Sequence, residues 1–259
     1  MGRTFSRARV ATVVLVMSLL ATGCGDGRQP KFEAAPSASP VLESAVASPS
    51  AVPSPQASPS VKPSASPKPV KNGNVLKHGA GTFRTAAGGT DVIGTAGALR
   101  TYYVQVESGI TTFDPDGFAA AVDQILADPH SWIASKKWRF KRVSTGVTPN
   151  FYIRLATPDT IDRMCGSAGL DTAGIFSCRF GNNVMINLYR WTNGATGFTD
   201  LNVYRNMVVN HETGHYLGHD HVFCPGAGRP APVMQQQTKS LQGCKANPYP
   251  YPDGVHYVG

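Results

Sequence analysis

The sequence predicts an α+β (α/β-like) domain over residues 73–259, in which a twisted mixed sheet packs against helices. Three observations favour this class. Segments that alternate apolar and polar residues, as half-buried strands do, are mixed with segments whose apolar residues recur every three or four positions, as on one face of a helix. The region is long enough for one domain with a substantial core. The stretch before it has too few large apolar residues to belong to that core.

The predicted elements follow the order strand, helix, strand, strand, strand, helix. The first strand lies within residues 99–108, where polar and apolar side chains alternate. Asp114 and Pro115 then open a helix over 116–127, whose apolar residues recur at spacings of four and three. Alternation returns in three further strands, predicted over 138–143, 151–155 and 184–189. The last helix begins near Thr199 or Asp200, either of which is a good N-cap.

The amino terminus predicts export. Three arginines precede an apolar run over residues 10–20, and small residues follow it before Cys24. This is the pattern of a secretory signal, and the run is too short to cross a bilayer comfortably. The residues before Cys24 also resemble a bacterial lipobox, in which that cysteine becomes the lipidated first residue. We therefore expect a lipoprotein signal peptide over 1–23 and a lipid anchor in the outer face of the cytoplasmic membrane, with an ordinary secretory signal as the alternative.

Residues 24–72 are predicted to form a disordered linker behind the lipid anchor. Pro, Ser, Ala and Val dominate this stretch, so burial cannot offset the entropy lost on ordering it. Its prolines favour extended conformations. The linker would therefore hold the domain of residues 73–259 away from the membrane, outside the cytoplasm.

The charge of the chain gives little support to nucleic-acid binding. The formal net charge is +8, but residues 1–23 carry three arginines and no acidic residue, which leaves +5 for the mature chain. No interleaved stripe of arginines and aromatic residues, typical of single-strand binders, is present. We expect a monomer with no nucleic-acid partner, and the modest positive charge is compatible with contact to anionic cell-wall polymers.

Four cysteines remain once Cys24 is assigned to the lipid, an even number that fits an oxidising compartment. Four cysteines allow three pairings, and the sequence alone does not choose among them. We expect the two local bridges, Cys165–Cys178 and Cys224–Cys244, each of which closes a short loop and contributes about 3 kcal/mol in the chain-entropy model. A thiolate metal site is the alternative, but the chain contains no C-x-x-C.

Four of the seven histidines fall within the eleven residues HETGHYLGHDH, 211–221. The apolar residues of the last predicted helix share one face with His211 and His215, because successive members are three or four positions apart. One turn apart, both imidazoles can reach a single ion. Glu212 lies next to the first of them and can take a proton from a water beside that ion. We therefore expect His211 and His215 as metal ligands and Glu212 as the catalytic base.

A catalytic zinc site usually has three protein ligands and one open position. Gly218 is suited to ending the helix in a left-handed turn, after which the chain can return His221 to the ion. His219 is the alternative third ligand if the helix continues through Gly218. Asp220 is a further alternative, a carboxylate one residue before His221. No Glu follows Glu212 in the chain, which excludes a distant glutamate ligand. The expected ligands of Zn²⁺ are then His211, His215 and His221.

The whole pattern, H-E-x-x-H-x-x-G-x-x-H, resembles the zinc signature of the metzincin clan of metallopeptidases. Met234 is similar in position to the methionine of that clan's Met-turn, which lies beneath the zinc ligands. The region also resembles the small secreted snapalysin-type proteases, in its HETGH start, its downstream cysteines and its ending over 247–250. Those proteases have Asp where His221 stands here. The run over 211–250 is most similar to an uncharacterised family of actinobacterial secreted metzincin-like proteins.

The resemblance covers roughly residues 99–250 and has structural implications. It implies a sheet over an active-site helix, a small C-terminal subdomain that closes the cleft, and an edge strand at 184–189 on which an extended peptide docks. Several metzincins carry a Tyr two residues after the Met-turn methionine that helps to stabilise the oxyanion, whereas this chain has Gln236. The other candidates for that role, among which the sequence does not choose, are Tyr249, Tyr251, Tyr257 and His256.

The motif and the resemblance together predict a zinc-dependent endopeptidase outside the cytoplasm. It would hydrolyse peptide or protein substrates with a metal-activated water and Glu212 as general base. Two alternatives stay open. One is a non-catalytic zinc-containing binding lipoprotein at the cell surface, and the other is a zinc hydrolase that acts on the peptides of peptidoglycan.

Overall fold

A computed structural model describes residues 74–259 of the chain. The predicted signal peptide over 1–23, the lipid anchor at Cys24 and the linker over 24–72 lie outside the described residues. Within 74–259, no helix combines the length and the hydropathy that a membrane-spanning helix needs.

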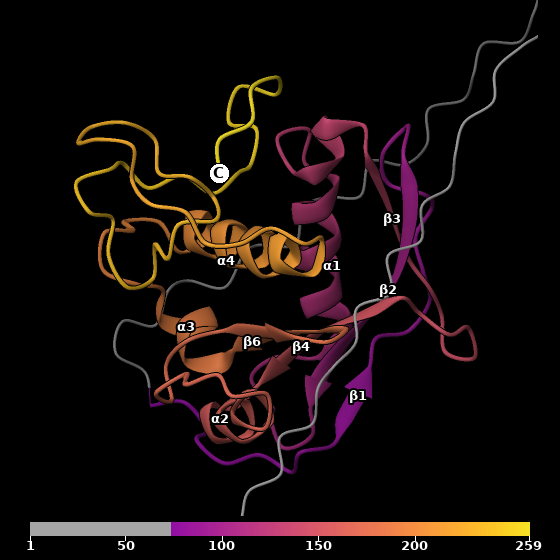
Figure 1. The fold of residues 1–259 in the computed structure, drawn as a ribbon. Helices are drawn as coiled ribbons and strands as arrows, with labels where there is room; N and C mark the ends of the chain where they lie inside the picture. The colour runs from indigo at the N-terminus through magenta and orange to yellow at the C-terminus, as the bar shows by residue number, and fades with distance from the viewer. Residues whose placement is uncertain (1–73) are drawn as a thin grey trace, which may run out of the picture. The chain divides into compact units, whose positions relative to one another are not determined.

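The described part contains one twisted mixed sheet of six strands, in the order β1-β2-β4-β6-β5, with β3 also paired to β2 (Figure 1). The strands β2, β3, β4 and β6 run parallel, whereas β1 and β5 are antiparallel to their neighbours. Their bounds are β1 (Phe83–Thr85), β2 (Ala98–Glu107), β3 (Trp138–Arg142), β4 (Phe151–Ala156), β5 (Cys178–Phe180) and β6 (Asn183–Asn187).

Helices cover both faces of the sheet. Figure 1 shows α4 above β4 and β6, and α2 below them. The helices are α1 (Pro115–Ala127), α2 (Pro158–Gly166), α3 (Leu188–Asn193) and α4 (Leu201–Tyr216), with a 3-10 turn η1 (Trp132–Ser135) after α1. Parallel neighbours such as β2 and β4 need a connection that crosses over a face of the sheet, and α1 lies in that connection.

Two hydrophobic cores follow from this layering. The larger one lies between α1, α4 and the face of the sheet that carries Val104 and Ile153. The smaller one lies on the opposite face, where Ile161 of α2 packs near Met185 of β6. Side chains alternate between the two faces along each strand, which is the period-two pattern by which the strands were predicted.

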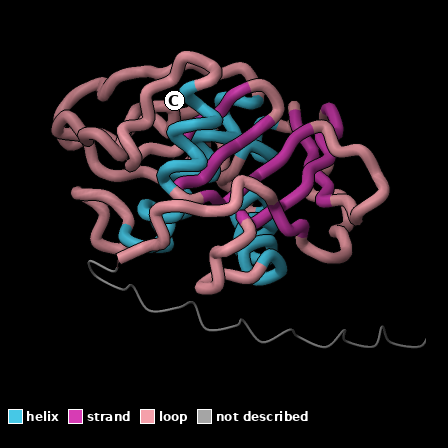
Figure 2. Tube along the Cα trace, turned by 90° about the horizontal axis from the view of Figure 1, so that it is seen from below, coloured by secondary structure: helices cyan, strands magenta, loops and turns pink. Residues whose placement is uncertain are grey.

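After α4 the chain is irregular. Residues 217–259 form turns and isolated bridges, with no further helix or strand (Figure 2). In Figure 1 this segment lies on the side of α4 away from the sheet. A disulfide between Cys224 and Cys244, whose Cα atoms are 5.9 Å apart, joins two of its loops.

The predicted local disulfides are both present, so the expected pairing is confirmed. Cys165–Cys178 joins α2 to β5 with the Cα atoms 6.6 Å apart. Both Cα separations lie within the range that a disulfide spans. With all four of these cysteines in disulfides, the alternative of a thiolate metal site is wrong.

The predicted order of elements is confirmed, with one element wrong at its end. The strand predicted over 184–189 stops at Asn187, and Leu188 and Tyr189 begin α3 instead. The Asn187 side chain accepts a hydrogen bond from the Tyr189 N–H (2.9 Å) and caps that helix. The short elements β1, β5, α2 and α3 were not predicted, because three to nine residues carry little periodicity.

The expectation that residues 184–189 form an edge of the sheet is wrong. Strand β6 lies between β4 and β5, with both sides paired. The edge is β5, which pairs antiparallel with β6 in a register that joins Arg179 to Val184. Any strand that is added to this side of the sheet must therefore pair with β5.

Candidate metal centre

Helix α4 carries the motif, and its two ends form as predicted. Its N-cap is Asp200, whose side chain accepts from the Asn202 N–H (2.7 Å). At the other end, Gly218 adopts a left-handed conformation with φ 95°. The N–H groups of Gly218 and His219 donate to the carbonyls of His215 (3.2 Å) and Gly214 (3.0 Å), the pattern of a Schellman turn. The turn reverses the chain directly after the second histidine of the motif.

This reversal brings His221 back to the two histidines of the helix. One ring nitrogen from each of His211, His215 and His221 lies within 4.8 Å of the other two, so the group could hold a metal ion. The Nε2 atoms of His215 and His221 are 3.0 Å apart. His219, the alternative third ligand, lies elsewhere: its ring stacks on Trp132 with the centroids 4.6 Å apart. Within the described residues, the group that could hold a metal ion therefore consists of these three histidines, and we call it the metal group.

Backbone carbonyls set the orientation of two of these rings. Nδ1 of His211 donates to the Val233 carbonyl, and Nδ1 of His215 donates to the His219 carbonyl, both at 2.8 Å. Because a carbonyl can only accept, the proton of each ring lies on Nδ1 and the lone pair lies on Nε2. Such outer hydrogen bonds are typical of histidines that bind metals.

Burial keeps the imidazoles neutral. Burial, followed by the effect of the neighbouring His215, lowers the pKa of His211 to about 3. Burial is also the largest cause of the lowered pKa of His215 and of His221. Metal ions bind the neutral form of the ring, so these shifts favour a metal over a proton at neutral pH.

Glu212 is buried and lines the same cavity as these histidines. Its Oε2 atom is enclosed and has no hydrogen-bond partner among the described residues. Burial raises the pKa of Glu212 to about 8, and the positive charge of Arg179 opposes this rise. An enclosed carboxylate oxygen without a partner is uncommon in a folded protein, and a functional role is one of its accepted explanations.

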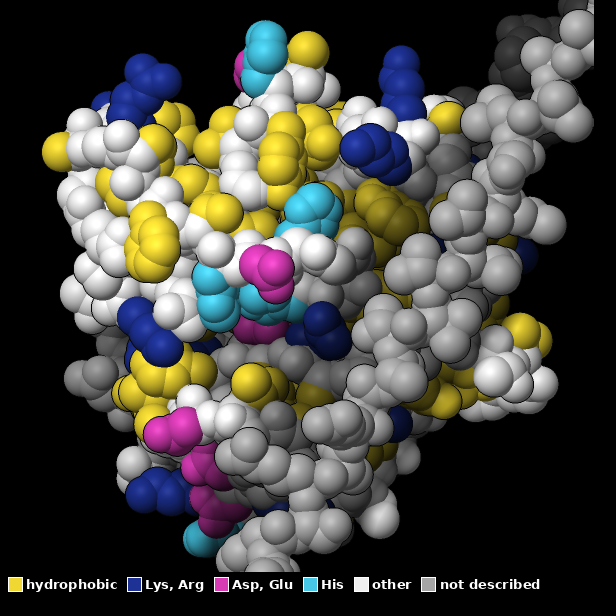
Figure 3. All heavy atoms as spheres, viewed as in Figure 1, with side chains coloured by type: hydrophobic (Ala, Val, Ile, Leu, Met, Phe, Trp, Pro, Cys, Tyr) yellow, Lys and Arg dark blue, Asp and Glu magenta, His cyan; other side chains and the backbone are white. Residues whose placement is uncertain are grey.

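The metal group opens into a cavity of about 320 Å³. Figure 3 shows histidine side chains gathered near the middle of this face, with acidic and basic side chains beside them. Besides His211, Glu212, His215 and His221, the lining includes Arg179, Met207, Val208, Gln236 and Lys239. The cavity therefore offers a molecule an apolar wall from α4 and two basic side chains, with the carboxylates of Asp171 and Asp220 also in its lining.

Comparison with known proteins identifies a family for this arrangement. The sequence model of DUF3152, a family described as proteins of unknown function, matches residues 70–252. The chain belongs to the DUF3152 family. Neither a curated protein nor a solved structure matches the chain. The matched residues include the metal group, Glu212, both disulfides and every strand and helix of the sheet domain.

In this DUF3152 domain, Met234 is buried under α4. A Cβ atom added to Gly214 would clash with the Sδ atom of Met234 and would lie 2.6 Å from Trp132. The preceding carbonyl, that of Val233, is the acceptor for His211. The segment around Met234 therefore supports the metal group both by packing and by a hydrogen bond.

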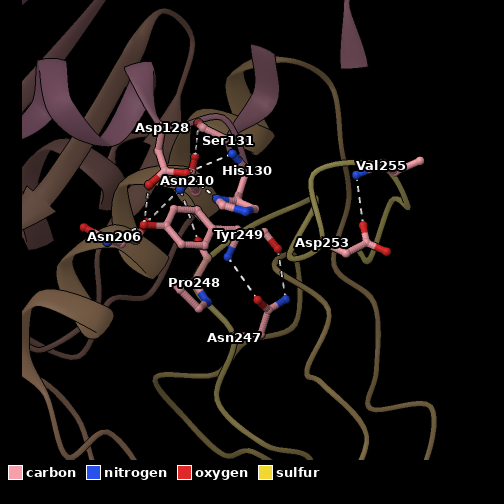
Figure 4. Close-up of polar contacts among 10 residues, drawn as sticks. All are labelled: Asp128, His130, Ser131, Asn206, Asn210, Asn247, Pro248, Tyr249, Asp253 and Val255. Atoms are coloured by element: carbon pink, nitrogen blue, oxygen red, sulfur yellow. Dashed lines mark hydrogen bonds and ion pairs between the residues drawn. The ribbon is translucent and has the colours of Figure 1, made fainter. Parts of the chain in front are cut away.

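Three tyrosines were candidates for stabilising the oxyanion, because this chain has Gln236 where several metzincins have a Tyr. None of the three lines the cavity. Figure 4 shows Tyr249 directed toward Asp128 and Asn206, and its hydroxyl donates to Asp128 (2.9 Å). The Tyr257 hydroxyl lies 3.0 Å from Nδ1 of His219. His256 is also placed elsewhere, because it pairs with Asp253 on the surface.

Arg179 is the residue of this site that sequence reasoning missed. It lies in the edge strand β5, and its Nη2 donates to the carbonyl of His215 (2.8 Å). Its Nε is enclosed and has no partner in the part of the chain that the structure describes. No sequence signal points to it, because the three-residue strand that carries it follows an irregular loop.

Proposed function

We propose that this protein is a zinc-dependent endopeptidase of metzincin-like design, in which His211, His215 and His221 bind the ion. One observation carries the proposal. Three imidazole nitrogens meet within 4.8 Å, in a cavity that Glu212 also lines. The likeness of residues 211–221 and Met234 to the metzincin signature supports the same assignment.

The donor set suits zinc in a catalytic rather than a structural role. Three neutral imidazoles from a rigid helix and the turn after it are a common catalytic set, and they leave a fourth position for water or substrate. Structural zinc sites are usually closed by four protein ligands, with cysteine prominent among them. Here Cys178, which lines the cavity, and Cys224, three residues after His221 in the chain, are both in disulfides.

In the proposed reaction the metal ion and Glu212 have separate roles. When bound, Zn²⁺ supplies a Lewis acid that polarises the scissile carbonyl and lowers the pKa of water toward about 7. The Glu212 carboxylate would accept the proton of the attacking water and later donate it to the leaving amine. Burial raises the pKa of this carboxyl group to about 8 in the metal-free chain, and the positive charge of a bound Zn²⁺ would lower it again, which favours the ionised form that accepts a proton.

We assign to Arg179 the stabilisation of negative charge in the cavity. Its guanidinium group lines the cavity beside Glu212 and is held by the His215 carbonyl. This charge would act where several metzincins use a Tyr and this chain has Gln236.

The substrate strand would lie along β5. This strand is the edge of the sheet, and both Cys178 and Arg179 line the cavity. An extended peptide that paired with β5 would therefore cross the metal group, with its main chain held by strand addition. The two disulfides suit an enzyme that works outside the cytoplasm on a lipid anchor, as the amino terminus predicts.

The proposal is tested with the Glu212→Gln variant of the full chain. We expect it to retain about one zinc ion per chain while losing turnover of a broad peptide library by at least about 10³-fold. Asp91→Asn, which changes an exposed carboxylate, is the matched control and should keep the parent's activity.

Two substrates and a measurement of zinc binding separate the candidates. Cleavage of peptides supports the proposal, and release of products from purified cell wall alone indicates the peptidoglycan hydrolase. Zinc binding by the parent chain without turnover of either substrate would overturn the enzymatic assignment in favour of a binding lipoprotein.

A further inference from the structure

A second cavity, of about 600 Å³, lies between α1 and the first half of α4. The metal ligands are not among its lining residues. Apolar side chains form much of its wall: Phe113, Phe118, Ile125 and Trp191. Gly117, Ala120 and Ala121 of α1 also line it, and their small size leaves the space between the helices open.

Arg205 of α4 lines this cavity with its charge unpaired. The residue is only 8% exposed, and its Nε donates to the Trp191 carbonyl (2.9 Å). The guanidinium carbon lies 4.7 Å from the ring centroid of Trp191 and 6.0 Å from that of Phe113. Among residues 74–259, no acceptor bonds Nη1 or Nη2 and no carboxylate forms an ion pair with Arg205. These two nitrogens are not fully enclosed, and Arg205 is one of the residues that line the cavity.

A buried arginine in this state lacks the partner that its charge requires. Burial lowers the pKa of Arg205 to about 10, which leaves the group positively charged at neutral pH. Buried charges are normally paired, because removal from water is unfavourable without compensation. Cation–π contacts with two rings compensate in part. The planar pair of free N–H groups matches the two oxygens of a carboxylate.

The two acidic residues of the cavity are already engaged by other groups. Asp114 caps α1 by accepting from the Gly117 N–H (2.8 Å). Asp128 accepts from the Tyr249 hydroxyl and from the His130 N–H (Figure 4). Neither forms an ion pair with Arg205. Because both add negative charge to the wall, a ligand with several negative charges is disfavoured.

We propose that this cavity binds a small monoanionic carboxylate with an apolar or aromatic body. The carboxylate lies on Nη1 and Nη2 of Arg205, and the body lies between Phe113 and the small residues of α1. Arg205 is six residues before His211 on the same helix, about 9 Å along its axis. The site is separate from the metal centre and does not depend on the proposed peptidase activity.

The test uses three small probes that share one body and differ in charge: phenylacetate, phenylacetamide and 2-phenylethylamine. Each is titrated into the full chain, and the indole N–H of Trp191 and the Nε–H of Arg205 are followed by NMR. We expect phenylacetate to shift both signals and to bind at least tenfold more tightly than the neutral amide. Equal binding of the three probes, or preference for the amine, would overturn the proposal.

Two variants and one control complete the test. Arg205→Gln should abolish the preference for phenylacetate over phenylacetamide. Ala120→Leu should block the cavity without touching the charge, and because Ala120 is exposed on α1 this variant should fold even if Arg205→Gln does not. Arg229→Gln, at an exposed arginine outside the cavity, should bind phenylacetate as the parent does. Undiminished phenylacetate binding by Ala120→Leu would exclude this cavity as the site.

Failure of this proposal can be told apart from failure of the proposed function. The titrations are repeated with Glu212→Gln, which should bind phenylacetate with unchanged affinity. Phenylacetate that binds only the zinc-loaded chain, and is lost with the metal, would place the ligand at the metal centre instead.

Discussion

Met234 packs against Gly214, the residue of α4 that lies between the two helical histidines of the metal group. A side chain as small as a methyl group at Gly214 would overlap the Met234 sulfur. The carbonyl just before Met234 also holds the ring of His211 (2.8 Å). The same loop that packs Met234 against α4 therefore also sets the orientation of the His211 ring.

Gly214→Ala should damage the metal centre without changing any ligand. The added methyl group must displace Met234 or Trp132, which we expect to destabilise the domain by about 1–3 kcal/mol. Zinc affinity should fall at least about tenfold, because the Val233 carbonyl shifts with its neighbour. Thermal unfolding and competitive zinc titration measure the two effects.

Gly166→Ala is the matched control for this substitution. Gly166 ends α2, and a Cβ atom there meets nothing within 4 Å. This change should be neutral or slightly stabilising, since alanine has the higher helix propensity. Equal zinc affinity in both variants would show that Met234 has no role in positioning the ligands.

His221→Ala and His219→Ala distinguish the two histidines that compete for the third ligand position. Removal of His221 should lower zinc affinity by at least about 100-fold, because one of three ligands is lost. Removal of the His219 side chain should leave zinc affinity within a few fold. Its backbone carbonyl, which accepts from His215, remains in place. The metal content of each variant is measured after dialysis against increasing concentrations of chelator. Loss of zinc from His219→Ala, with zinc retained by His221→Ala, would contradict the assignment of His221 as the third ligand.

The stability of the metal-free chain should depend on Glu212. Burial raises the pKa of this group from 4.5 to about 8, so between these values the unfolded chain releases a proton that the folded chain retains. Stability from this group is fully present below pH 4.5 and is lost as the pH rises toward 8. His211, whose pKa is lowered to about 3, acts below pH 6.5 in the opposite direction.

Urea unfolding in the presence of a chelator measures this dependence. Between pH 6.5 and 8 the free energy of unfolding of the parent should fall by about 1–2 kcal/mol. In Glu212→Gln that slope should be absent. A slope that is the same in both proteins would mean that Glu212 is ionised in the metal-free fold.

Arg179→Gln should reduce turnover more than substrate binding. Loss of a charge that acts mainly in the transition state should lower kcat by about 10- to 100-fold with a smaller change in KM. Zinc content should stay at the parent's value, because Arg179 contacts a ligand only through the His215 backbone. Arg179→Lys should recover part of the activity, and Arg229→Gln serves as the control on an exposed arginine.

The sequence by itself determined the features that depend on neighbours a few residues away. The periodicity of α1, β2, β4 and α4 was visible, since apolar side chains recur on one face of each element. The same local geometry placed His211 and His215 one turn apart. Gly218 identified the end of α4. The sequence left three cysteine pairings open, and the two local disulfides that we expected are the ones present.

Only the tertiary structure decided which segments meet. Strand β5 exists because β6 pairs with it, so three residues with no pattern of their own became the edge of the sheet. Arg179 reaches the carbonyl of a residue 36 positions away. The cavity at Arg205 forms because α1 lies across the first half of α4. Such contacts depend on how whole elements pack together, and local propensity carries no information about the partner that each surface will find.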